Sequence, residues 1–313
     1  MSKINIGIIG AGFIANEHIK VIKNINDMKL YGITSRTLKK CVLLKKKYKF
    51  TKIYKNFLEM ISDKNIDAVI ICVSVHNSYK ILAEIIPYKK PFFIEKPVGI
   101  NYLENTKILD LVKKYKTPNM VGFNRRHYSI FHKGLKLLSK NGGIIGFDIE
   151  GHERFWQKHK LTKVEKINWH HLNSIHTIDL INFFGGEISK KYVISKKTSL
   201  KKNDNINSIF LFKNGIIGSY KSYWHSPGGW KITLYGDGMT VVFNPLEKGY
   251  IINKNFKSKI IAPSQYDKIY KPGFYDQMKS FRDLIINSKI KWPSLNIENA
   301  IHSSKLTEYL ANE

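Results

Sequence analysis

Cysteine and long apolar runs are scarce in this chain of 313 residues. Its two cysteines, Cys41 and Cys72, lie far apart in apolar surroundings, so we expect reduced packing residues rather than a disulfide framework. No apolar run approaches the roughly 20 residues that span a bilayer, and the apolar N-terminal stretch is broken by glycines and lacks a basic leader. We therefore expect a soluble, cytoplasmic protein with no membrane role.

Arginine is also scarce. The formal net charge is +28, yet only five of the 52 basic residues are arginine, and the lysines are spread along the whole chain. Specific nucleic-acid sites depend on arginine for bidentate contacts to bases and phosphates. We therefore expect no specific nucleic-acid partner, although a chain this basic should adhere weakly to polyanions at low salt.

Short apolar strands alternate with helical stretches over the first 124 residues. The strands are expected at 4–10, 29–35, 67–74, 92–96 and 119–124, and the helices at 13–24, 37–48, 77–86 and 101–115. Hydrophobicity that is continuous rather than alternating marks strands buried on both faces, as in a parallel sheet. The pattern predicts a doubly wound α/β domain over residues 1–124.

The pattern changes after residue 125, where long β-rich segments replace the alternation. Strands are expected at 144–155, 206–213, 216–225, 230–236 and 239–243, and helices at 128–139, 170–184, 274–288 and 296–311. The turn signals "KNG" and "GDG" predict hairpins between neighbouring strands. We predict a second domain over residues 125–313, of the α+β class, with an open and mostly antiparallel sheet.

The stretch "GIIGAGFIA" follows the first expected strand and opens the first expected helix. It places Gly10, Gly12 and Ala15 in the pattern G-x-G-x-x-A, with Phe13 and Ile14 between. Gly10 allows a tight turn, Gly12 lets a pyrophosphate approach the backbone, and Ala15 permits close packing of helix on strand. At the first strand–helix junction of a βαβ array, this pattern predicts a dinucleotide site that includes all five residues.

The residues after the second expected strand bear on the choice of cofactor. NAD-binding sites carry a carboxylate there for the ribose 2′-hydroxyl, whereas this chain has Ser35 and Arg36. A hydroxyl and a guanidinium suit a 2′-phosphate, so NADP(H) is favoured over NAD(H). The alternative is that Arg36 stacks on the adenine, which would serve either cofactor.

The strand "FFIEKP" ends in Glu95, Lys96 and Pro97. In open α/β sheets, ligands lie beyond the carboxyl ends of the strands, so we expect these three residues near a nicotinamide, with Lys96 as a site residue. Three further candidates for cofactor contacts follow strand 67–74: Ser74, His76 and Asn77.

Four motifs together resemble the Gfo/Idh/MocA family of nicotinamide-dependent oxidoreductases: the glycine motif, "EKPVG", "GFNRRH" and "NSIHTIDLINFFGG". The resemblance implies a Rossmann domain joined to an antiparallel-sheet domain. It also implies hydride transfer to or from a secondary carbinol of a sugar, sugar nucleotide or cyclitol. In this family the residue matching Lys96 lies beside the reacting carbon, and the proline matching Pro97 is often cis.

The last of these motifs contains His176 and Asp179, whose spacing puts both on one face of a helix. An imidazole with a pKa near neutrality is a natural proton carrier for alcohol–ketone interconversion, so we expect His176 to be catalytic beside a charged Lys96. Relatives often carry an aspartate at the position of Leu172, so this chain lacks that carboxylate. The neighbouring Asn173 is expected to hold the substrate. Whether Lys96 or His176 is the immediate proton partner stays open.

Aromatic rings stack on the C–H faces of sugars, and arginine binds phosphate or carboxylate. The expected substrate contacts are Lys96, Asn124, Arg125, Arg154, Trp156, Asn173, His176 and Asp179. Core packing and a solvated charged face are the competing interpretation of the arginines and the tryptophan. His152, His159, His170 and His171 match no closed zinc pattern, so no metal is expected.

The sequence leaves one alternative function, a non-catalytic dinucleotide-binding sensor or regulatory protein, suggested by Leu172. The retention of both Lys96 and His176 favours the enzyme. By analogy with relatives we expect a homodimer or homotetramer acting on a small carbohydrate.

Overall fold

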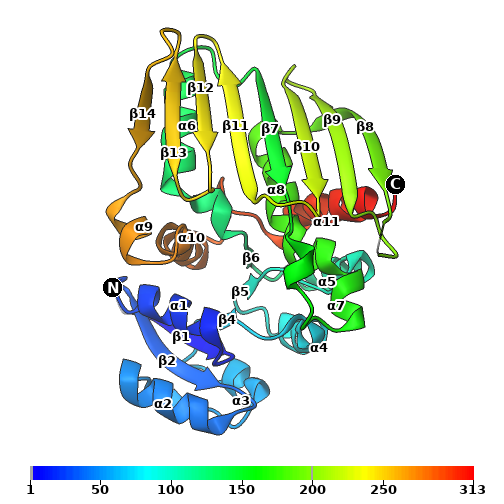
Figure 1. Ribbon diagram of the computed structural model, residues 1–313. Coiled ribbons are helices and arrows are strands. Elements are labelled where there is room, and N and C mark those ends of the chain that lie inside the picture. Colours follow the sequence, from blue (N-terminus) through cyan, green and yellow to red (C-terminus); the bar gives the residue numbers. More distant parts are fainter. Residues whose placement is uncertain (1–2, 199) are drawn as a thin grey trace. The chain divides into compact units, whose positions relative to one another are not determined.

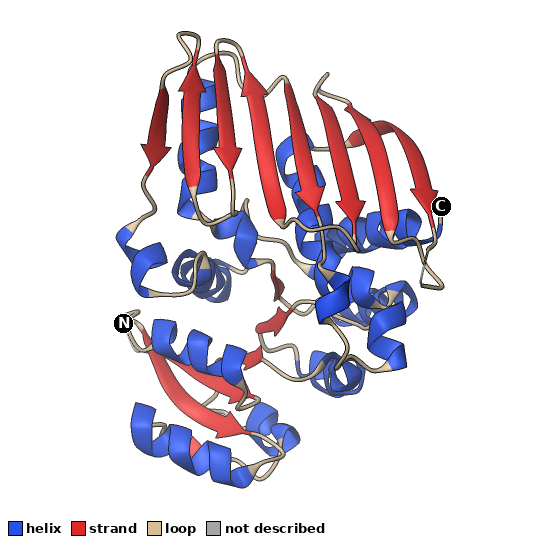
Figure 2. Ribbon diagram, in the orientation of Figure 1, coloured by secondary structure: helices blue, strands red, loops and turns tan. Residues whose placement is uncertain are grey.

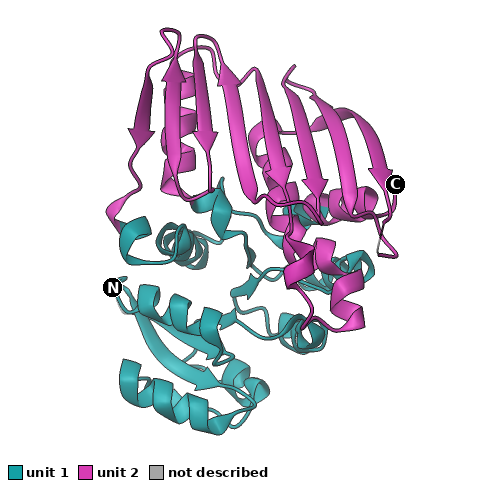
Figure 3. Cartoon of the chain, viewed as in Figure 1, with its two compact units in different colours: residues 1–127, 266–301 teal, residues 128–265, 302–313 magenta. Residues whose placement is uncertain are grey.

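The computed structural model (Figure 1) describes residues 3–198 and 200–313, whose helices and strands are distinguished in Figure 2. The chain forms two compact units (Figure 3). Unit 1 comprises the described residues up to His127 together with Tyr266–Ile301, and unit 2 comprises Tyr128–Gln265 and His302–Glu313. The sequence pattern predicts a boundary after residue 124, with all later residues in one domain, whereas residues 266–301 belong to unit 1.

Unit 1 contains a six-stranded parallel sheet in the order β3-β2-β1-β4-β5-β6. The strands are β1 (Ile4–Ile9), β2 (Met28–Thr34), β3 (Lys52–Ile53), β4 (Ala68–Ile71), β5 (Phe92–Glu95) and β6 (Asn119–Gly122). This is the predicted doubly wound sheet, with the two-residue β3 as the strand that the sequence did not reveal. Because the strand order reverses between β1 and β4, their carboxyl ends open a crevice suited to a ligand.

The helices of this unit cover the sheet and supply its apolar core. They are α1 (Phe13–Ile22), α2 (Leu38–Tyr48), α3 (Phe57–Ser62), α4 (Val75–Ile85), α5 (Tyr102–Tyr115) and α10 (Phe274–Asn287), with α9 (Gln265–Ile269) at the unit boundary. In α10, Phe274, Met278 and Phe281 recur at helical spacing and join the core formed by α1 and β1. This apolar face explains why the segment belongs to unit 1.

Unit 2 contains an eight-stranded sheet in the order β14-β13-β12-β11-β7-β10-β9-β8, in which only β7 and β10 pair in parallel. The strands are β7 (Gly146–Gly151), β8 (Ile188–Lys196), β9 (Asn205–Phe212), β10 (Ile217–Tyr223), β11 (Trp230–Gly236), β12 (Met239–Phe243), β13 (Gly249–Asn253) and β14 (Ser258–Ile261). The open, mostly antiparallel sheet is confirmed, as are the hairpins β9–β10 and β11–β12.

Helices cover one face of this sheet (Figure 1). They are α6 (Ser129–Ser139), α8 (Ile175–Gly185) and the part of α11 (Ile297–Asn312) that belongs to unit 2, while α7 (Lys163–Ile167) and a π-helical turn (His170–Ser174) precede α8. Phenylalanine, isoleucine and leucine side chains form the core between helices and sheet, where phenylalanines of α6, α8 and the strands contact one another. Within the described ranges, no helix combines the length and apolar character needed to cross a bilayer.

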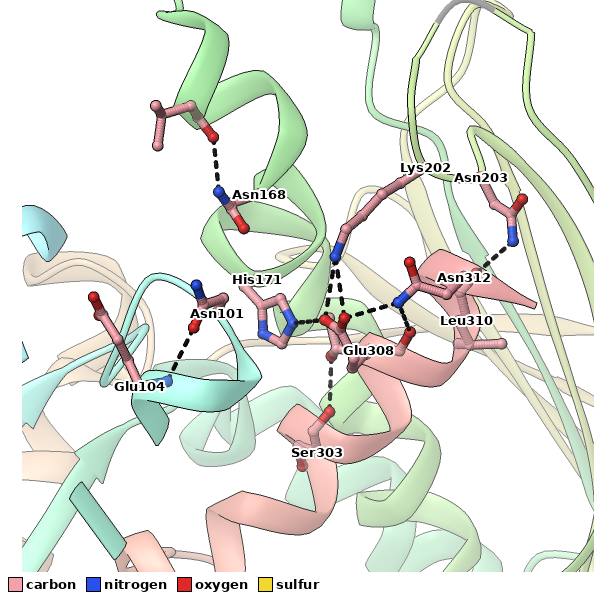
Figure 4. A network of polar contacts seen from close by, with 12 residues as sticks. Asn101, Glu104, Asn168, His171, Lys202, Asn203, Ser303, Glu308, Leu310 and Asn312 are labelled. Carbon is pink, nitrogen blue, oxygen red and sulfur yellow. Dashed lines mark hydrogen bonds and ion pairs between the residues drawn. The ribbon is translucent and has the colours of Figure 1, made fainter. Parts of the chain in front are cut away.

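A polar network joins the π-helical turn to α11 inside unit 2. Figure 4 shows the side chains of His171, Lys202 and Asn312 converging on Glu308. His171 Nε2 lies 2.9 Å from Glu308 Oε2, and Lys202 Nζ lies 3.2 Å from the same oxygen. The hydrogen bond from His171 lowers the pKa of Glu308 to about 2, and burial lowers the pKa of His171. Both shifts favour a neutral imidazole that donates to an ionised carboxylate.

These shifts predict that acid weakens the fold. Unfolded His171 takes up a proton below its ordinary pKa of 6.5 while the folded residue resists, so stability falls as the pH drops through that value. The Glu308 contribution is present above its ordinary pKa of 4.5 and is lost as the pH falls from there toward 2. His171→Gln keeps a donor for Glu308 but does not titrate. Between pH 7.5 and pH 5.5, the melting temperature of both proteins should fall. We expect the fall in His171→Gln to be smaller than the fall in the wild type by about 2 °C.

The exposed His302 on α11 offers a matched control, because His302→Gln also removes one imidazole. Thermal melts of the three proteins at both pH values decide the matter. An unchanged pH dependence in His171→Gln would show that this imidazole does not couple folding to pH.

Candidate functional site

The turn between β1 and α1 has a shape that only glycine fits. Gly10 has φ +115°, and an added Cβ would lie 2.2 Å from the carbonyl oxygen of Cys72. Its N–H donates to the carbonyl oxygen of Thr34 at 2.8 Å. Ala15, one helical turn later, is fully buried against the sheet. The first and last residues of the glycine motif thus hold β1, β4 and α1 close together.

Gly12 differs from Gly10 because it faces open space. It is the N-cap of α1, and no atom lies within 4 Å of the position that a Cβ would occupy. The first turn of α1 has no acidic residue, and its backbone N–H groups lack acceptors within the helix. Phe13 is 72% exposed and Ile14 is half-buried beside it. This helix end can receive an anion.

A cavity of about 470 Å³ lies at the carboxyl ends of β1, β2 and β4. Gly10 and Gly12 line one part of it, and Ser35 and Arg36 line another. The other described residues that line it include three lysines and no carboxylate: Ile9, Ala11, Thr34, Thr37, Lys40, Lys55, Asn56, Phe57, Cys72, Val73, Ser74, Asn77, Lys80 and Ile81. A pocket with four cationic side chains suits a ligand that carries several negative charges.

Of the three residues after β4 that were expected to contact the cofactor, two line the cavity. Ser74 and Asn77 line the cavity, and the Asn77 amide donates to Ser74 Oγ at 2.7 Å, which fixes both side chains at the start of α4. His76 is exposed and is not among the lining residues of that cavity.

The end of β5 is tied to α1 through Glu95. Its Oε1 lies 2.6 Å from Nε2 of His18, which is fully buried and stacks on the ring of Phe274 with centroids 4.6 Å apart. Lys96 is half-buried, and the Lys96–Pro97 peptide bond is cis. The carboxylate thus anchors the strand end from which Lys96 projects. Sequence reasoning missed His18, since no local pattern separates it from an ordinary helix residue.

Asn124 and Arg125 lie in a short 3-10 turn after β6, also in unit 1. Asn124 is buried, and its amide donates to the carbonyl oxygen of Pro272 at 3.1 Å. Its Oδ1 lies 3.5 Å from the guanidinium of Arg125. Both side chains therefore have partners inside the unit.

In unit 2, the carboxylate of Glu153 organises the residues ahead of α8. Glu153 is 4% exposed. Its Oε2 accepts from the indole N–H of Trp169 at 2.8 Å and from Nδ2 of Asn173 at 2.6 Å, and its Oε1 accepts from Oγ of Ser174 at 2.7 Å. Burial raises the pKa of Glu153, and the three hydrogen bonds oppose that shift. A glutamate after an apolar strand was the only signal in the sequence, and its partners lie 16 to 21 residues further on.

The other expected substrate residues of unit 2 lie after β7 and on α8. Arg154 is exposed, and its Nε donates to the carbonyl oxygen of Gly228 in the loop before β11. Trp156 follows on a short 3-10 turn and is 44% exposed. His176 on α8 is 7% exposed, and its ring lies 6.0 Å from the ring of Trp230, measured between centroids.

Asp179 lies on α8 with His176 but makes a different contact. It is 1% exposed, and its Oδ1 accepts a hydrogen bond from Ser303 Oγ of α11 at 2.6 Å. Its carboxylate thus joins α8 to α11 inside unit 2.

Each unit brings part of the expected set together. Unit 1 gathers the glycine turn, Ser35, Arg36, Ser74 and Asn77 around one cavity, and unit 2 links Asn173 through Glu153 to the segment that carries Arg154. A 3-2-1-4-5-6 parallel sheet with a glycine turn and an anion-receptive helix end defines the class of dinucleotide-binding Rossmann domains.

Comparison with known proteins finds a family match in the N-terminal part of the chain. Residues 4–123 match the Gfo/Idh/MocA family, described as an oxidoreductase family with an NAD-binding Rossmann fold. Myo-inositol 2-dehydrogenase of Thermotoga maritima is 34% identical over 141 residues, which are 45% of this chain and 42% of that protein. The chain thus matches less than half the length of this curated relative. Residues 4–123 thus match the model of the family that the sequence motifs resemble.

Solved structures share the fold over almost the whole chain. A Gfo/Idh/MocA family oxidoreductase from Vibrio cholerae superposes with a TM-score of 0.82 at 18% identity, covering 99% of this chain and 97% of that one. Levoglucosan dehydrogenase in complex with NADH has a TM-score of 0.80 at 15% identity, covering 99% and 96%. These likenesses confirm the predicted combination of a parallel α/β part with an open antiparallel sheet.

Proposed function

We propose that this chain is an NAD(P)-dependent oxidoreductase that transfers a hydride to or from a secondary carbinol of a sugar, sugar nucleotide or cyclitol. The cationic cavity at the glycine turn carries the proposal, because its position and charge fit a dinucleotide. The relative from Thermotoga maritima is named as an inositol dehydrogenase, and one structural neighbour is named as a levoglucosan dehydrogenase. Both names support a polyhydroxylated substrate.

The residues present fit a nicotinamide dinucleotide. The open space at Gly12 leaves room for a pyrophosphate against the N-terminus of α1, and Ser35 and Arg36 line the same cavity. When bound, the cofactor supplies the hydride acceptor or donor. Ser74 and Asn77 would complete its binding site, and Phe13 and Ile14 would border it.

Lys96 and His176 have separate roles in this proposal. The ammonium of Lys96 stabilises negative charge that develops on the substrate oxygen, and the imidazole of His176 carries the hydroxyl proton. Glu95, held by His18, keeps the end of β5 in place beneath Lys96. Arg154 and Trp156 are exposed and supply a guanidinium and an aromatic face for the substrate.

NADP(H) is the favoured cofactor within this proposal. Arg36, Lys40, Lys55 and Lys80 line the cavity, and no carboxylate is among the described lining residues, so a ribose 2′-phosphate would find cations and no repulsion. A carboxylate that could bind the 2′-hydroxyl of NAD is missing from the same set.

We expect NADPH to bind more tightly than NADH in a fluorescence titration at moderate salt. Arg36→Leu should weaken NADPH binding by about 10-fold or more, because a charge-assisted contact to phosphate is lost, and should change NADH binding by less than about 3-fold. Lys39→Leu is a matched control, since Lys39 is an exposed neighbour on α2 outside the cavity lining.

Three outcomes would contradict parts of the proposal. Equal losses for both cofactors in Arg36→Leu would favour stacking of Arg36 on adenine. NADH binding as tight as NADPH would overturn the cofactor preference. Saturable binding without turnover of any polyol or keto-sugar would favour the alternative, a non-catalytic dinucleotide-binding sensor.

We also propose that the chain forms a homodimer or homotetramer through the helix-free face of the unit 2 sheet. Register places Tyr192 opposite Ile209, and Tyr250 opposite Ile260, and all four side chains are exposed. Exposed apolar patches of this kind mark association surfaces.

Two free cysteines, together with a reaction on small metabolites, fit the cytoplasm as the place of action.

Light scattering of the purified protein tests the assembly. We expect a mass at least twice the 36.3 kDa of one chain, and a shift toward the monomer in Ile209→Lys, because a charge would be buried at the interface. Leu103→Lys, at an exposed apolar residue of unit 1, should leave the mass unchanged. A monomeric wild type at micromolar concentration would refute this part.

A further inference from the structure

The amide of Asn173 has a defined orientation, because the ionised carboxylate of Glu153, which three side chains contact, can only accept hydrogen bonds. The 2.6 Å contact between Glu153 Oε2 and the Asn173 amide requires the NH₂ group, not the carbonyl oxygen, to face the carboxylate. The same oxygen also accepts from Trp169, and Ser174 donates to the other. The carboxylate is therefore surrounded by donors from the π-helical turn and its N-cap, and rotation of the amide would break the shortest of these contacts.

The carbonyl oxygen of Asn173 points away from Glu153 as a consequence. Asn173 is half-buried, whereas Glu153 and Ser174 are buried. Across residues 3–198 and 200–313, no donor contacts Asn173 Oδ1. His176 follows three residues later, within one helical turn. This oxygen is thus an acceptor on the turn that leads into α8, the helix of the proposed proton carrier His176.

We propose that Glu153 is a positioning residue that turns the carbonyl oxygen of Asn173 toward the substrate, where it accepts a hydrogen bond from a substrate hydroxyl. This inference rests on the proposed function for its substrate. It assigns Asn173 the role of acceptor, and it selects ligands that present a hydroxyl at that point over ligands that present a carbonyl or carboxylate oxygen. Glu153 acts through Asn173 and does not touch the substrate.

Two substitutions separate positioning from simple structural support. In Glu153→Gln the amide oxygen can accept from both Trp169 and Asn173, and the new NH₂ group can donate to Ser174, so the orientation is kept. Glu153→Met has similar size but no acceptor, so the Asn173 amide is free to turn. Glu187→Met removes a carboxylate that is exposed on the same unit and serves as the control.

Kinetics on polyols test the substrate contact. The probe is whichever of myo-inositol, levoglucosan and D-glucose the wild type oxidises fastest, with its monodeoxy derivatives. We expect Glu153→Met to raise KM by about 10-fold with kcat within about 3-fold, because a contact made equally in ground and transition states is lost. Glu153→Gln should recover most of the wild-type KM, and Glu187→Met should match the wild type.

The monodeoxy substrates separate positioning from structural support. If Glu153 were only structural, its replacement would not change the loss of kcat/KM that follows deletion of a substrate hydroxyl. In the wild type, deletion of one hydroxyl should lower kcat/KM by about 10-fold through this contact, and in Glu153→Met that penalty should vanish. A penalty of the same size in Glu153→Met, or an unchanged KM, would overturn the inference.

A second measurement does not depend on turnover. In protein labelled with ¹⁵N-asparagine, the Asn173 side-chain NH₂ signal, assigned through Asn173→Asp, should be protected from hydrogen exchange in the wild type and in Glu153→Gln and unprotected in Glu153→Met. Equal protection in all three would overturn the inference. If NADPH binds but no polyol reacts, the proposed function fails, and this signal still decides whether Glu153 orients Asn173.

Discussion

The close approach of Gly10 to the carbonyl oxygen of Cys72 is the constraint on which the proposed dinucleotide site of unit 1 depends. A side chain at Gly10 would lie 2.2 Å from that oxygen, so only glycine lets the loops after β1 and β4 meet at the reversal of strand order. Directly after this tight turn, α1 begins at Phe13, with Gly12 as its N-cap and its N-terminus open. The cavity and its anion-receptive helix end lie at this turn, and Arg36, Lys40, Lys55 and Lys80 from other segments line the same cavity.

A carboxylate held by hydrogen-bonded partners recurs at a strand end in both units; Glu95 is half-buried and Glu153 is buried. Glu95 binds His18 at the end of β5, and Glu153 binds Trp169, Asn173 and Ser174 after β7. Burying a carboxylate, even in part, costs free energy unless hydrogen-bond donors contact it. Each of these carboxylates therefore constrains the positions of its partner side chains. In unit 1 this fixes the strand end that carries Lys96, and in unit 2 it fixes the turn that leads to the helix of His176. Rigid support of this kind is what a reactive site needs.

Sequence patterns revealed the elements whose signals are local. Continuous apolar strands and the glycine motif were sufficient to predict the parallel sheet, and the hairpin turns predicted two of the antiparallel pairs. Four strands were missed. β3 is two residues long, β8 is an edge strand rich in exposed lysine, and β13 and β14 form a short hairpin at the other edge of the unit 2 sheet. Partners of Glu95 and Glu153 lie 77 and 16 to 21 residues away, and such pairings depend on tertiary packing, which no local pattern records.

The rate of hydride transfer by the cofactor-loaded protein tests the central claim most directly. The proteins to compare are the wild type, Lys96→Met and a control, Lys107→Met, which replaces an exposed lysine of α5. Stopped-flow absorbance at the nicotinamide band, with the best polyol as substrate, should show transfer by the wild type and the control. In Lys96→Met, transfer should fall by about 100-fold or more while the cofactor Kd stays within about 3-fold, because the ammonium stabilises charge only as the reaction proceeds. Full activity in Lys96→Met would contradict the account.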